Sequence, residues 1–266
     1  MPREPLSRTW PLAPSGATDW LRELCGDGLT GFMPPPMPDA VWVLNAMYEH
    51  EQGPSETSYH EHRQALVAEG SVEPHIIGDL DLDLDAVGVT TGGGIGRAGH
   101  PGPGWRRLRW AELARRTGDP VVPSGVLPCF RCFPSVRKDG SWPLGIIPPT
   151  EGSLDRETWT RLVAVLAEFS PAGPDTPCFA YYNPLTLGAE DFDNLHVRAG
   201  RLGDAGFLYD HSEADFSPSN LWAEDRSWCL CTDYDLWATK VAGPRSLIEA
   251  LLSDLEIEAI RLPRSS

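Results

Sequence analysis

The sequence predicts an α+β protein, in which a mixed or mostly antiparallel sheet packs against a few helices joined by long Pro/Gly-rich loops. Short β-rich apolar runs at 40–48 and 226–243 are interleaved with amphipathic segments at 105–118 and 153–170, an order typical of this class. The 26 glycines and 26 prolines are spread over 266 residues without a period, which indicates ordered loops and excludes collagen-like sequence.

The first part of the chain predicts a tail followed by a buried strand. Residues 1–18 are rich in Pro, Ser and Arg and predict a flexible tail. Residues 19–25 predict one or two helical turns. Residues 33–38 (MPPPMP) predict an extended segment, because consecutive prolines cannot form a helix interior. The apolar run 40–48 (AVWVLNAMY) then predicts a buried strand.

The middle of the chain predicts two helices separated by a strand and a loop. Residues 57–70 predict a helix that ends at its final glycine, and residues 76–91 predict a strand. Residues 105–118 predict an amphipathic helix that turns Leu108 toward a core and its arginines outward. Residues 121–150 carry many prolines and little periodicity, which predicts irregular structure.

The segment 153–170 predicts the clearest helix, with Ser153 as its N-cap and acidic residues in the first turn. Its apolar side chains at helical spacing are Trp159, Leu162, Val163, Leu166 and Phe169.

The last part of the chain predicts a hairpin, a helix and a final strand. Residues 226–243 predict two strands around a turn at Asp233–Asp235. Pro244 then opens a helix, because proline is favoured at the first helical position. Residues 255–262 alternate between apolar and polar side chains and predict a strand.

The length allows one large domain or two small ones. We expect a single α+β domain over residues 19–266, with two lobes divided near residues 140–150 as the alternative. The sequence has no run of about 18 apolar residues and no apolar core of signal-peptide length near residue 1, so we expect a cytoplasmic protein. The six cysteines are then expected to be reduced thiols.

The net charge of −16 is unevenly distributed. Residues 151–266 hold nine basic and twenty acidic residues, whereas residues 1–150 hold thirteen and eighteen. A chain this acidic repels nucleic acid and anionic membranes, so neither is expected as a partner. It would instead attract a basic protein.

The stretch 78–105 combines an aspartate ladder with a glycine-rich loop. The aspartates Asp79, Asp81, Asp83 and Asp85 alternate with leucines and would lie on one side of a strand. They are weak candidates for a metal site, since calcium ligands usually come from a curled loop. The loop satisfies G-x-G-x-x-G at 94–99, but Pro101 and Pro103 prevent the helix that a dinucleotide site needs. The arginines of 105–116 are the expected counter-charge to the ladder.

Two further pairs are weak candidates for sites. His60 and His62 could share a metal only on a strand, because residues two apart on a helix face different directions. Cys129 and Cys132 form a C-x-x-C for which a loop, a redox pair and a metal site all remain open. Cys229 and Cys231 would share one face of a strand.

The segment 188–235 carries eleven acidic residues and three arginines together with tryptophans and tyrosines. Aromatic side chains among carboxylates suit a surface that binds a basic partner. The candidate binding residues are Trp222, Glu224, Asp225, Asp233, Tyr234, Asp235 and Trp237. Two alternatives are an enzyme that uses a carboxylate pair such as Asp233 and Asp235, with or without a metal, and a small-molecule-sequestering pocket lined by tryptophans. No cofactor is expected.

Three strings of the sequence carry a resemblance. They are 225–254 (DRSWCLCTDYDLWATKVAGPRSLIEALLSD), 105–113 (WRRLRWAEL) and 148–155 (PPTEGSLD), and they resemble a family of uncharacterised actinobacterial proteins. The resemblance covers most of the chain and implies no activity and no site residues. Immunity-type inhibitors of such bacteria are often acidic cytoplasmic α+β proteins, and this similarity of type favours a basic partner such as a toxin.

Overall fold

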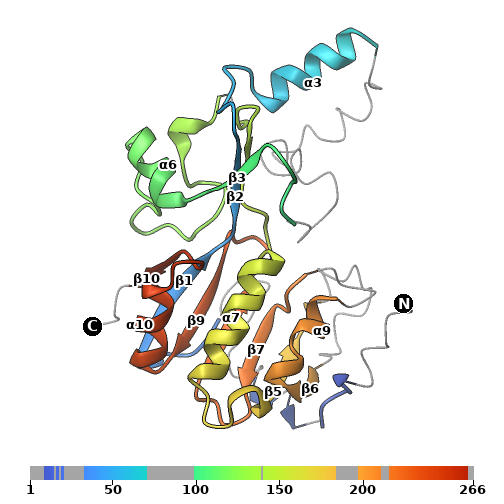
Figure 1. Cartoon of the computed structure of the whole chain (residues 1–266), viewed down its shortest axis with the longest axis vertical. Coiled ribbons are helices and arrows are strands. Elements are labelled where there is room, and N and C mark those ends of the chain that lie inside the picture. The colour runs from blue at the N-terminus through green and yellow to red at the C-terminus, as the bar shows by residue number, and fades with distance from the viewer. Residues whose placement is uncertain are drawn as a thin grey trace. The chain divides into compact units, whose positions relative to one another are not determined.

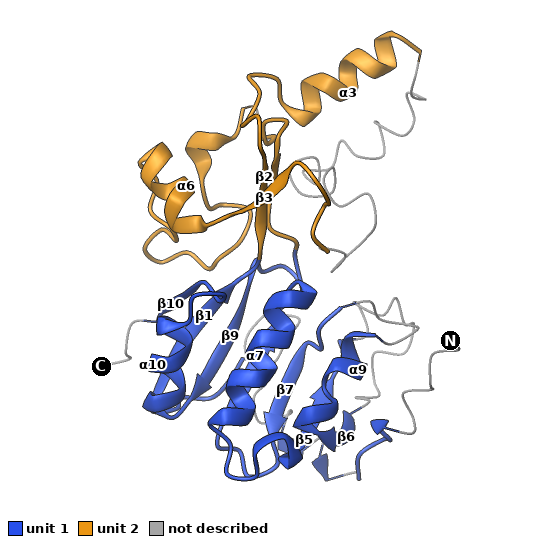
Figure 2. Cartoon of the chain, in the orientation of Figure 1, with its two compact units in different colours: residues 1–45, 151–266 blue, residues 46–150 orange. Residues whose placement is uncertain are grey.

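The computed structural model is an α+β fold and describes residues 9–14, 16–17, 19–20, 33–70, 99–138, 140–183, 197–210 and 216–262 (Figure 1). The chain forms two compact units (Figure 2). Unit 1 consists of residues 1–45 and 151–266, and unit 2 of residues 46–150. Unit 2 is therefore an insertion into unit 1. One boundary lies near the predicted division at 140–150, but the other cuts through the apolar run 40–48.

Unit 1 is built on an antiparallel sheet of seven strands. In spatial order they are β10 (Ala259–Arg261), β1 (Asp39–Leu44), β9 (Ala238–Gly243), β8 (Cys229–Thr232), β7 (Asn220–Ala223), β5 (Pro177–Tyr181) and β6 (Val197–Arg201). The predicted hairpin at 226–243 is confirmed as β8 and β9, which pair from Cys229 with Ala242 to Thr232 with Thr239. The predicted final strand forms over only three residues of 255–262.

Helices cover one face of this sheet (Figure 1). They are α7 (Arg156–Glu168), α9 (Gly206–Tyr209) and α10 (Arg245–Ser253), with short 3-10 turns η3 (Gly173–Asp175) and η4 (Leu202–Asp204) beside them. Trp159, Leu162 and Leu166 of α7 are buried as predicted, and together with Leu247 and Leu251 of α10 they join one apolar core. Burial of side chains of this size contributes about 1.5–3 kcal/mol each before entropy is counted.

The N-cap of α7 is Asp155 and not Ser153 as predicted. The Asp155 carboxylate accepts hydrogen bonds from the Thr158 amide at 3.0 Å and from the Thr158 hydroxyl at 2.6 Å. Ser153 is buried and its hydroxyl lies 3.1 Å from that of Ser217, so it ties the start of the helix to the loop before β7. Serine and aspartate are both common helix N-caps. Here the Ser153 hydroxyl is engaged with Ser217, and Asp155 caps the helix.

The N-terminal strap, defined here as residues 10–14, 16–17 and 19–20, runs along the edge strand β6 and then onto the other face of the sheet, where Trp20 packs. The amide of Ala199 donates to Pro11 and the amide of Ala13 donates to Val197, so the strap continues the sheet beyond β6. Trp10 is fully buried, and its indole Nε1 donates to the Asp204 carbonyl at 3.0 Å. The prediction of a flexible tail over 1–18 is therefore wrong for the described part, because Trp10 anchors it to the core.

Unit 2 has a three-stranded antiparallel sheet of β3 (Trp105–Leu108), β2 (Met47–His50) and β4 (Ile146–Ile147). Its helices are α3 (Tyr59–Ala68) and α6 (Trp110–Thr117), with a 3-10 turn η2 (Pro134–Val136). The predicted helix at 57–70 is confirmed with slightly narrower bounds. Ser58 and Glu61 cap it reciprocally, an N-terminal signal that the sequence contains as S-x-x-E.

The prediction of a continuous helix over 105–118 is wrong. Residues Trp105–Leu108 form β3, and the helix begins only after the N-cap Arg109. Pairing with β2, from Met47 with Leu108 to His50 with Trp105, holds this segment extended. The tertiary strand partner thus overrides a helical pattern that the arginines and apolar residues also satisfy.

Two arginines of this segment pair with glutamates of unit 2. Arg106 and Arg116 both form ion pairs with Glu49 of β2 and with Glu112 of α6. The Glu49 side chain is only 4% exposed, so this pairing neutralises a buried carboxylate. The aspartates at 79–85, the predicted strand 76–91 and the G-x-G-x-x-G loop except its last glycine lie outside the described residues, as does most of the predicted helix 19–25.

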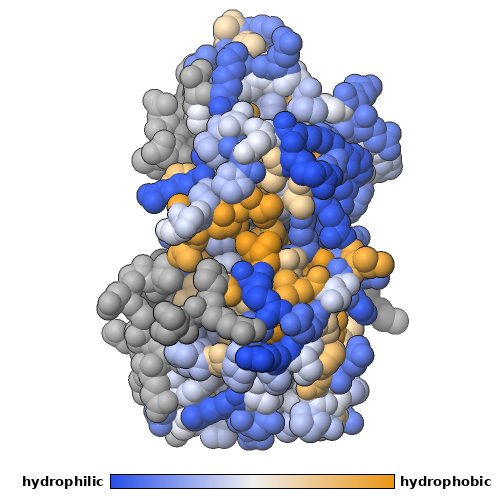
Figure 3. Space-filling model, turned by 90° about the vertical axis from the view of Figure 1, so that its left-hand side faces the viewer, coloured by the Kyte–Doolittle hydropathy of each residue, from blue (hydrophilic) through white to orange (hydrophobic). Residues whose placement is uncertain are grey.

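The surface of the described residues is mixed in character. Hydrophilic side chains make up much of the face drawn in Figure 3, with apolar side chains exposed among them. No helix of the described part is long and apolar enough to cross a bilayer.

Candidate functional site

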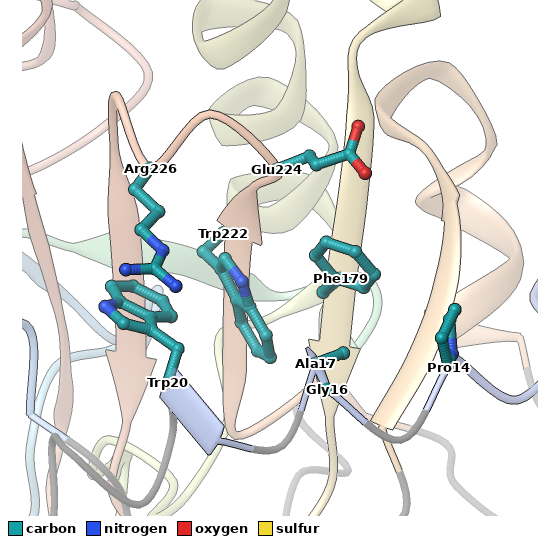
Figure 4. Close-up of a pocket in the computed structure, with 8 residues that line it drawn as sticks. All are labelled: Pro14, Gly16, Ala17, Trp20, Phe179, Trp222, Glu224 and Arg226. Carbon is teal, nitrogen blue, oxygen red and sulfur yellow. The ribbon is translucent and has the colours of Figure 1, made fainter.

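Three aromatic rings form a cluster on the face of the unit 1 sheet opposite α7 and α10. Trp222 of β7 and Phe179 of β5 are directly paired across the two strands, and their ring centroids lie 5.6 Å apart. Trp20 of the N-terminal strap lies against Trp222 from the other side, with centroids 5.3 Å apart. Figure 4 shows Trp222 between the other two rings. The sheet and the strap therefore build one aromatic wall together.

This wall belongs to a pocket with a volume of about 240 Å³. Its lining residues are Pro14, Gly16, Ala17 and Trp20 of the strap, Phe179 and Trp222 of the sheet, and Glu224 and Arg226 of the turn between β7 and β8 (Figure 4). Sites for drug-sized ligands span roughly 300–1,000 Å³. The pocket is smaller than this range and fits a molecule of one or two rings.

Arg226 supplies the positive charge of the pocket, and its backbone is unusual. Its φ of 59° is in the left-handed region, where non-glycine residues are uncommon. Its amide donates to the Ala223 carbonyl at 2.8 Å, which closes the turn. Its guanidinium carbon lies 5.3 Å from the Trp20 ring centroid. The turn thus places a planar cation over one ring of the wall.

Arg226 is one of the unit 1 arginines that form no ion pair among the described residues, as are Arg198 and Arg245. Arg156, Arg161, Arg201 and Arg261 of unit 1 each form ion pairs with carboxylates. Arg226 forms no ion pair with any described residue, and its side chain is exposed. A guanidinium stacked on an aromatic ring keeps its in-plane N–H donors available for an incoming anion.

Glu224 adds a carboxylate at the rim of the same pocket. It is exposed, and Figure 4 shows its side chain extending from the turn above the strand that carries Phe179. Asp225 follows it, and its carboxylate accepts from the Ser227 amide at 2.9 Å, so this acid stabilises the turn. The pocket therefore combines apolar ring surface, chiefly of the partly exposed Phe179, with one cation and one anion at its edge.

The seven predicted partner-binding residues lie in two separate groups. Trp222, Glu224 and Asp225 are at the β7–β8 end of the sheet, and Asp233, Tyr234, Asp235 and Trp237 are at the β8–β9 connection. Successive turns of an antiparallel meander lie at opposite ends of the strands, so the structure does not bring the two groups together. Asp233 and Trp237 are fully buried, and Trp222 is 2% exposed.

The second group includes a carboxylate cluster that sequence analysis identified in part. Burial raises the pKa of Glu151 to about 7, and the negative charge of Asp235 adds to the effect. Burial and the neighbouring Asp233 raise the pKa of Asp235 as well. These acids are the closest match to the predicted carboxylate pair.

The predicted metal candidates that the structure describes do not converge. His60 and His62 lie on α3, where His60 Nε2 is 2.7 Å from the side-chain amide nitrogen of Gln64 and His62 is exposed. Within the described ranges, no three side chains of His, Cys, Asp or Glu are placed to hold a metal ion.

The cysteines of the described residues are free thiols. Cys229 and Cys231 are buried on the strand β8, and Cys229 packs in the same aromatic cluster as Trp222. Their predicted common face follows from the register, in which Cys229 pairs with Trp222 and Cys231 pairs with Asn220. Burial raises the pKa of Cys231 and of Cys229. They are structural residues of the sheet.

Only Trp222 and Glu224 of the lining residues were predicted from the sequence, and Trp20, Phe179 and Arg226 are the most important of those that were not. Phe179 reaches Trp222 only through the pairing of β5 with β7, which are about forty residues apart in sequence. A local signal existed for Arg226, because it follows two acids in a short connection between strands. Comparisons with protein-family models, with curated proteins and with solved structures found no match to this chain.

Proposed function

We propose that this chain is a small-molecule-binding protein whose ligand is a planar anion of one or two rings. The observation that carries the proposal is the Arg226 guanidinium, stacked on Trp20 at the edge of an aromatic pocket and without an ion pair among the described residues. Phe179 and the apolar strap residues supply contact with a ring, and Arg226 supplies paired N–H donors suited to a carboxylate.

The size and charges of the pocket narrow the class of ligand. A volume of about 240 Å³ suits a compact ring system with one acidic group and excludes large cofactors such as dinucleotides. Glu224 at the rim disfavours a second negative charge on that side of the ligand and can accept a hydrogen bond from it. A mono-anionic aromatic acid with a donor group meets these conditions.

The experiment is a ligand panel measured by tryptophan fluorescence. Aromatic carboxylates of one and two rings are each compared with their neutral primary amides, so that shape is held nearly constant while charge changes. Because Trp20 and Trp222 line the pocket, binding should quench fluorescence saturably. We expect the carboxylates to bind about 10- to 100-fold more tightly than the amides, the effect of one charge-assisted hydrogen-bonding pair. Equal binding of acid and amide, or no saturable quenching by any member, would count against the proposal.

A basic protein partner is the second candidate function. The net charge of −16 and the exposed Glu224 and Asp225 at the pocket rim favour it. Of the other described acids of 188–235, Asp204 and Asp210 pair with arginines, Asp233 is buried and Asp235 is exposed, so only part of the acidic surface is available to a partner. A partner recovered at low salt by the natural chain and lost by a Glu224→Gln/Asp225→Asn variant would support this function.

A further inference from the structure

Cys129 and Cys132 stand at the two ends of a reverse turn in unit 2. The amide of Cys132 donates to the carbonyl of Cys129 at 2.9 Å. A four-residue turn of this kind keeps its first and last Cα atoms within about 7 Å. A disulfide needs a Cα separation of about 4.4–6.8 Å, so the backbone already brings the two cysteines close to bonding distance.

The two thiols differ in access to solvent. Cys132 is fully buried, and burial raises its pKa to about 11. Cys129 is partly exposed and follows the buried Pro128. An external reagent can therefore reach Cys129, and Cys132 is placed behind it. This is the arrangement of an attacking thiol and a resolving thiol.

Arg137 places a positive charge near both sulfur atoms. Its charge favours the thiolate of Cys132, and both cysteines act electrostatically on Arg137 in turn. Its Nε is buried and has no hydrogen-bond partner within the part of the chain that the structure describes. A nearby cation stabilises a thiolate relative to the thiol. In turn, a thiolate would provide the buried Nε of Arg137 with a compensating negative charge.

A second arginine lies on the outer side of the turn. The Arg131 guanidinium lies 5.6 Å from the ring centroid of the exposed Phe130, and both residues sit between the cysteines. The approach to Cys129 is therefore cationic and partly apolar. An anionic disulfide of low molecular weight suits this approach better than a cationic one.

We propose that Cys129 and Cys132 are a redox-active dithiol that exchanges with low-molecular-weight disulfides of the glutathione class. The Cys129 thiolate attacks one sulfur of the small disulfide, which forms a mixed disulfide and releases one small thiolate. The Cys132 thiolate then attacks the Cys129 sulfur, which forms the Cys129–Cys132 bond and releases the second small thiolate. The protein loses two electrons, the small disulfide gains them, and the two protons of the thiols pass to the released thiolates through solvent.

The aromatic core of unit 2 supplies an optical signal for this exchange. Phe133, directly after Cys132, is buried with a φ of 56° and lies 5.3 Å from Trp110 and 6.5 Å from Trp142 between ring centroids. A change in the position of Cys132 moves Phe133 against both tryptophans. Oxidation should therefore change tryptophan emission as well as thiol reactivity.

The test is an equilibration of the full chain with graded ratios of reduced and oxidised glutathione, followed by alkylation and peptide mass spectrometry. We expect Cys129 and Cys132 to lose alkylation together in one two-electron transition, with the tryptophan emission following it. The buried Cys178, Cys229 and Cys231 serve as internal controls and should stay reduced. Free Cys129 and Cys132 at the most oxidising ratio would overturn the proposal.

Two variants separate the steps. Cys132→Ala should stop the reaction at a stable mixed disulfide between glutathione and Cys129, whereas Cys129→Ala should leave Cys132 largely unmodified. Arg137→Gln should slow disulfide formation about threefold, because a nearby cation favours the thiolate while the nucleophilicity of that thiolate changes in the opposite sense. If either cysteine variant fails to fold, the proposal can still be tested on the natural chain by comparing two small disulfides at low salt. Oxidised glutathione should react with the natural chain faster than the cationic disulfide cystamine does. Equal rates for the two disulfides, or a mixed disulfide on Cys132 instead of Cys129, would contradict the proposed geometry.

Discussion

Arg226 occupies a backbone conformation that glycine would adopt at lower cost. A left-handed non-glycine residue costs about 1–2 kcal/mol. Among the described residues, the turn bond to Ala223 and the contact with Trp20 offset this cost. An exposed cation–π contact contributes about 0.5–1 kcal/mol, which does not exceed that cost. The side chain therefore contributes little to folding, and binding is the better explanation for an arginine at this position.

Glu151 makes the stability of the protein depend on pH. Its pKa of about 7 in the folded state exceeds the ordinary value of 4.5, so between these values the folded state holds a proton that the unfolded state has released. The free energy of unfolding should thus fall as the pH rises from about 4.5 to about 7. Glu151→Gln removes this loss, and above pH 7 it should stabilise the protein by up to about 3 kcal/mol.

Urea denaturation of both proteins at a series of pH values measures this effect. Glu168→Gln is the matched control, because Glu168 is exposed near the end of α7 and should leave the pH profile nearly unchanged. A Glu151→Gln variant whose stability parallels that of the natural chain from pH 4 to pH 8 would show that Glu151 is not protonated in the fold.

Individual site residues could be predicted only where neighbours in sequence are neighbours in space. Glu224 and Asp225 were found as acids next to Trp222 because all three lie at one strand end. Trp20 joins them through the strap, and its neighbours in sequence give no sign of this contact. The burial of Asp233 also could not be read from composition, because acids of a charged segment are normally solvated.

Among the elements, the N-terminal strap is the one on which the pocket depends. Gly200 of β6 lies under the Trp10 ring, and a Cβ at this position would come within 2.5–2.7 Å of three ring atoms. The ring cannot easily move, because it is fully buried and hydrogen-bonded to Asp204. Gly200→Ala should therefore destabilise the protein by about 1–3 kcal/mol and displace the strap from the sheet.

The loss of stability is measured by urea denaturation and the displacement by limited proteolysis near the N-terminus. Ligand binding should weaken in parallel, since four lining residues of the pocket belong to the strap. Gly206→Ala is the control, because a Cβ there meets no atom within 4 Å. A Gly200→Ala variant with the same free energy of unfolding as the natural chain would show that Trp10 does not anchor the strap.

Secondary structure was predictable where local pattern and tertiary context agree. The helices α7 and α10 carry apolar stripes, although each begins slightly later than predicted, after the N-caps Asp155 and Pro244, and the β8–β9 hairpin is confirmed around its predicted turn. The run 40–48 contains two strands, β1 and β2, because the chain leaves one unit and enters the other between Asn45 and Ala46. Periodicity cannot reveal such a crossing, since the parts of both strands that fall within this run are largely buried and apolar.

At the scale of the whole molecule, unit 2 interrupts unit 1 at a single place. The amide of Asn45 donates to the Trp237 carbonyl at 2.9 Å, and the amide of Gly152 donates to the Leu236 carbonyl at 3.0 Å. The two ends of the insertion are thus hydrogen-bonded to the neighbouring residues Leu236 and Trp237 of the β8–β9 connection. Replacing residues 46–150 with a short Gly/Ser linker should leave a cooperatively folding unit 1, because its apolar core consists of its own residues.

Near-ultraviolet circular dichroism and urea denaturation of the shortened chain measure whether unit 1 folds alone. The shortened chain should also retain the pocket, all of whose lining residues are in unit 1. A broad, non-cooperative transition would show that unit 1 needs the insertion to fold.

Calorimetric titration of Arg226→Gly with the tightest-binding aromatic carboxylate measures whether Arg226 binds the planar anion in the aromatic pocket. Glycine suits the left-handed backbone, so the free energy of unfolding should stay within about 1 kcal/mol of the natural value. Affinity should fall about 10- to 100-fold, with the neutral amide unaffected and the exposed control Arg245→Gln unchanged. Undiminished affinity of Arg226→Gly for the carboxylate would contradict the account.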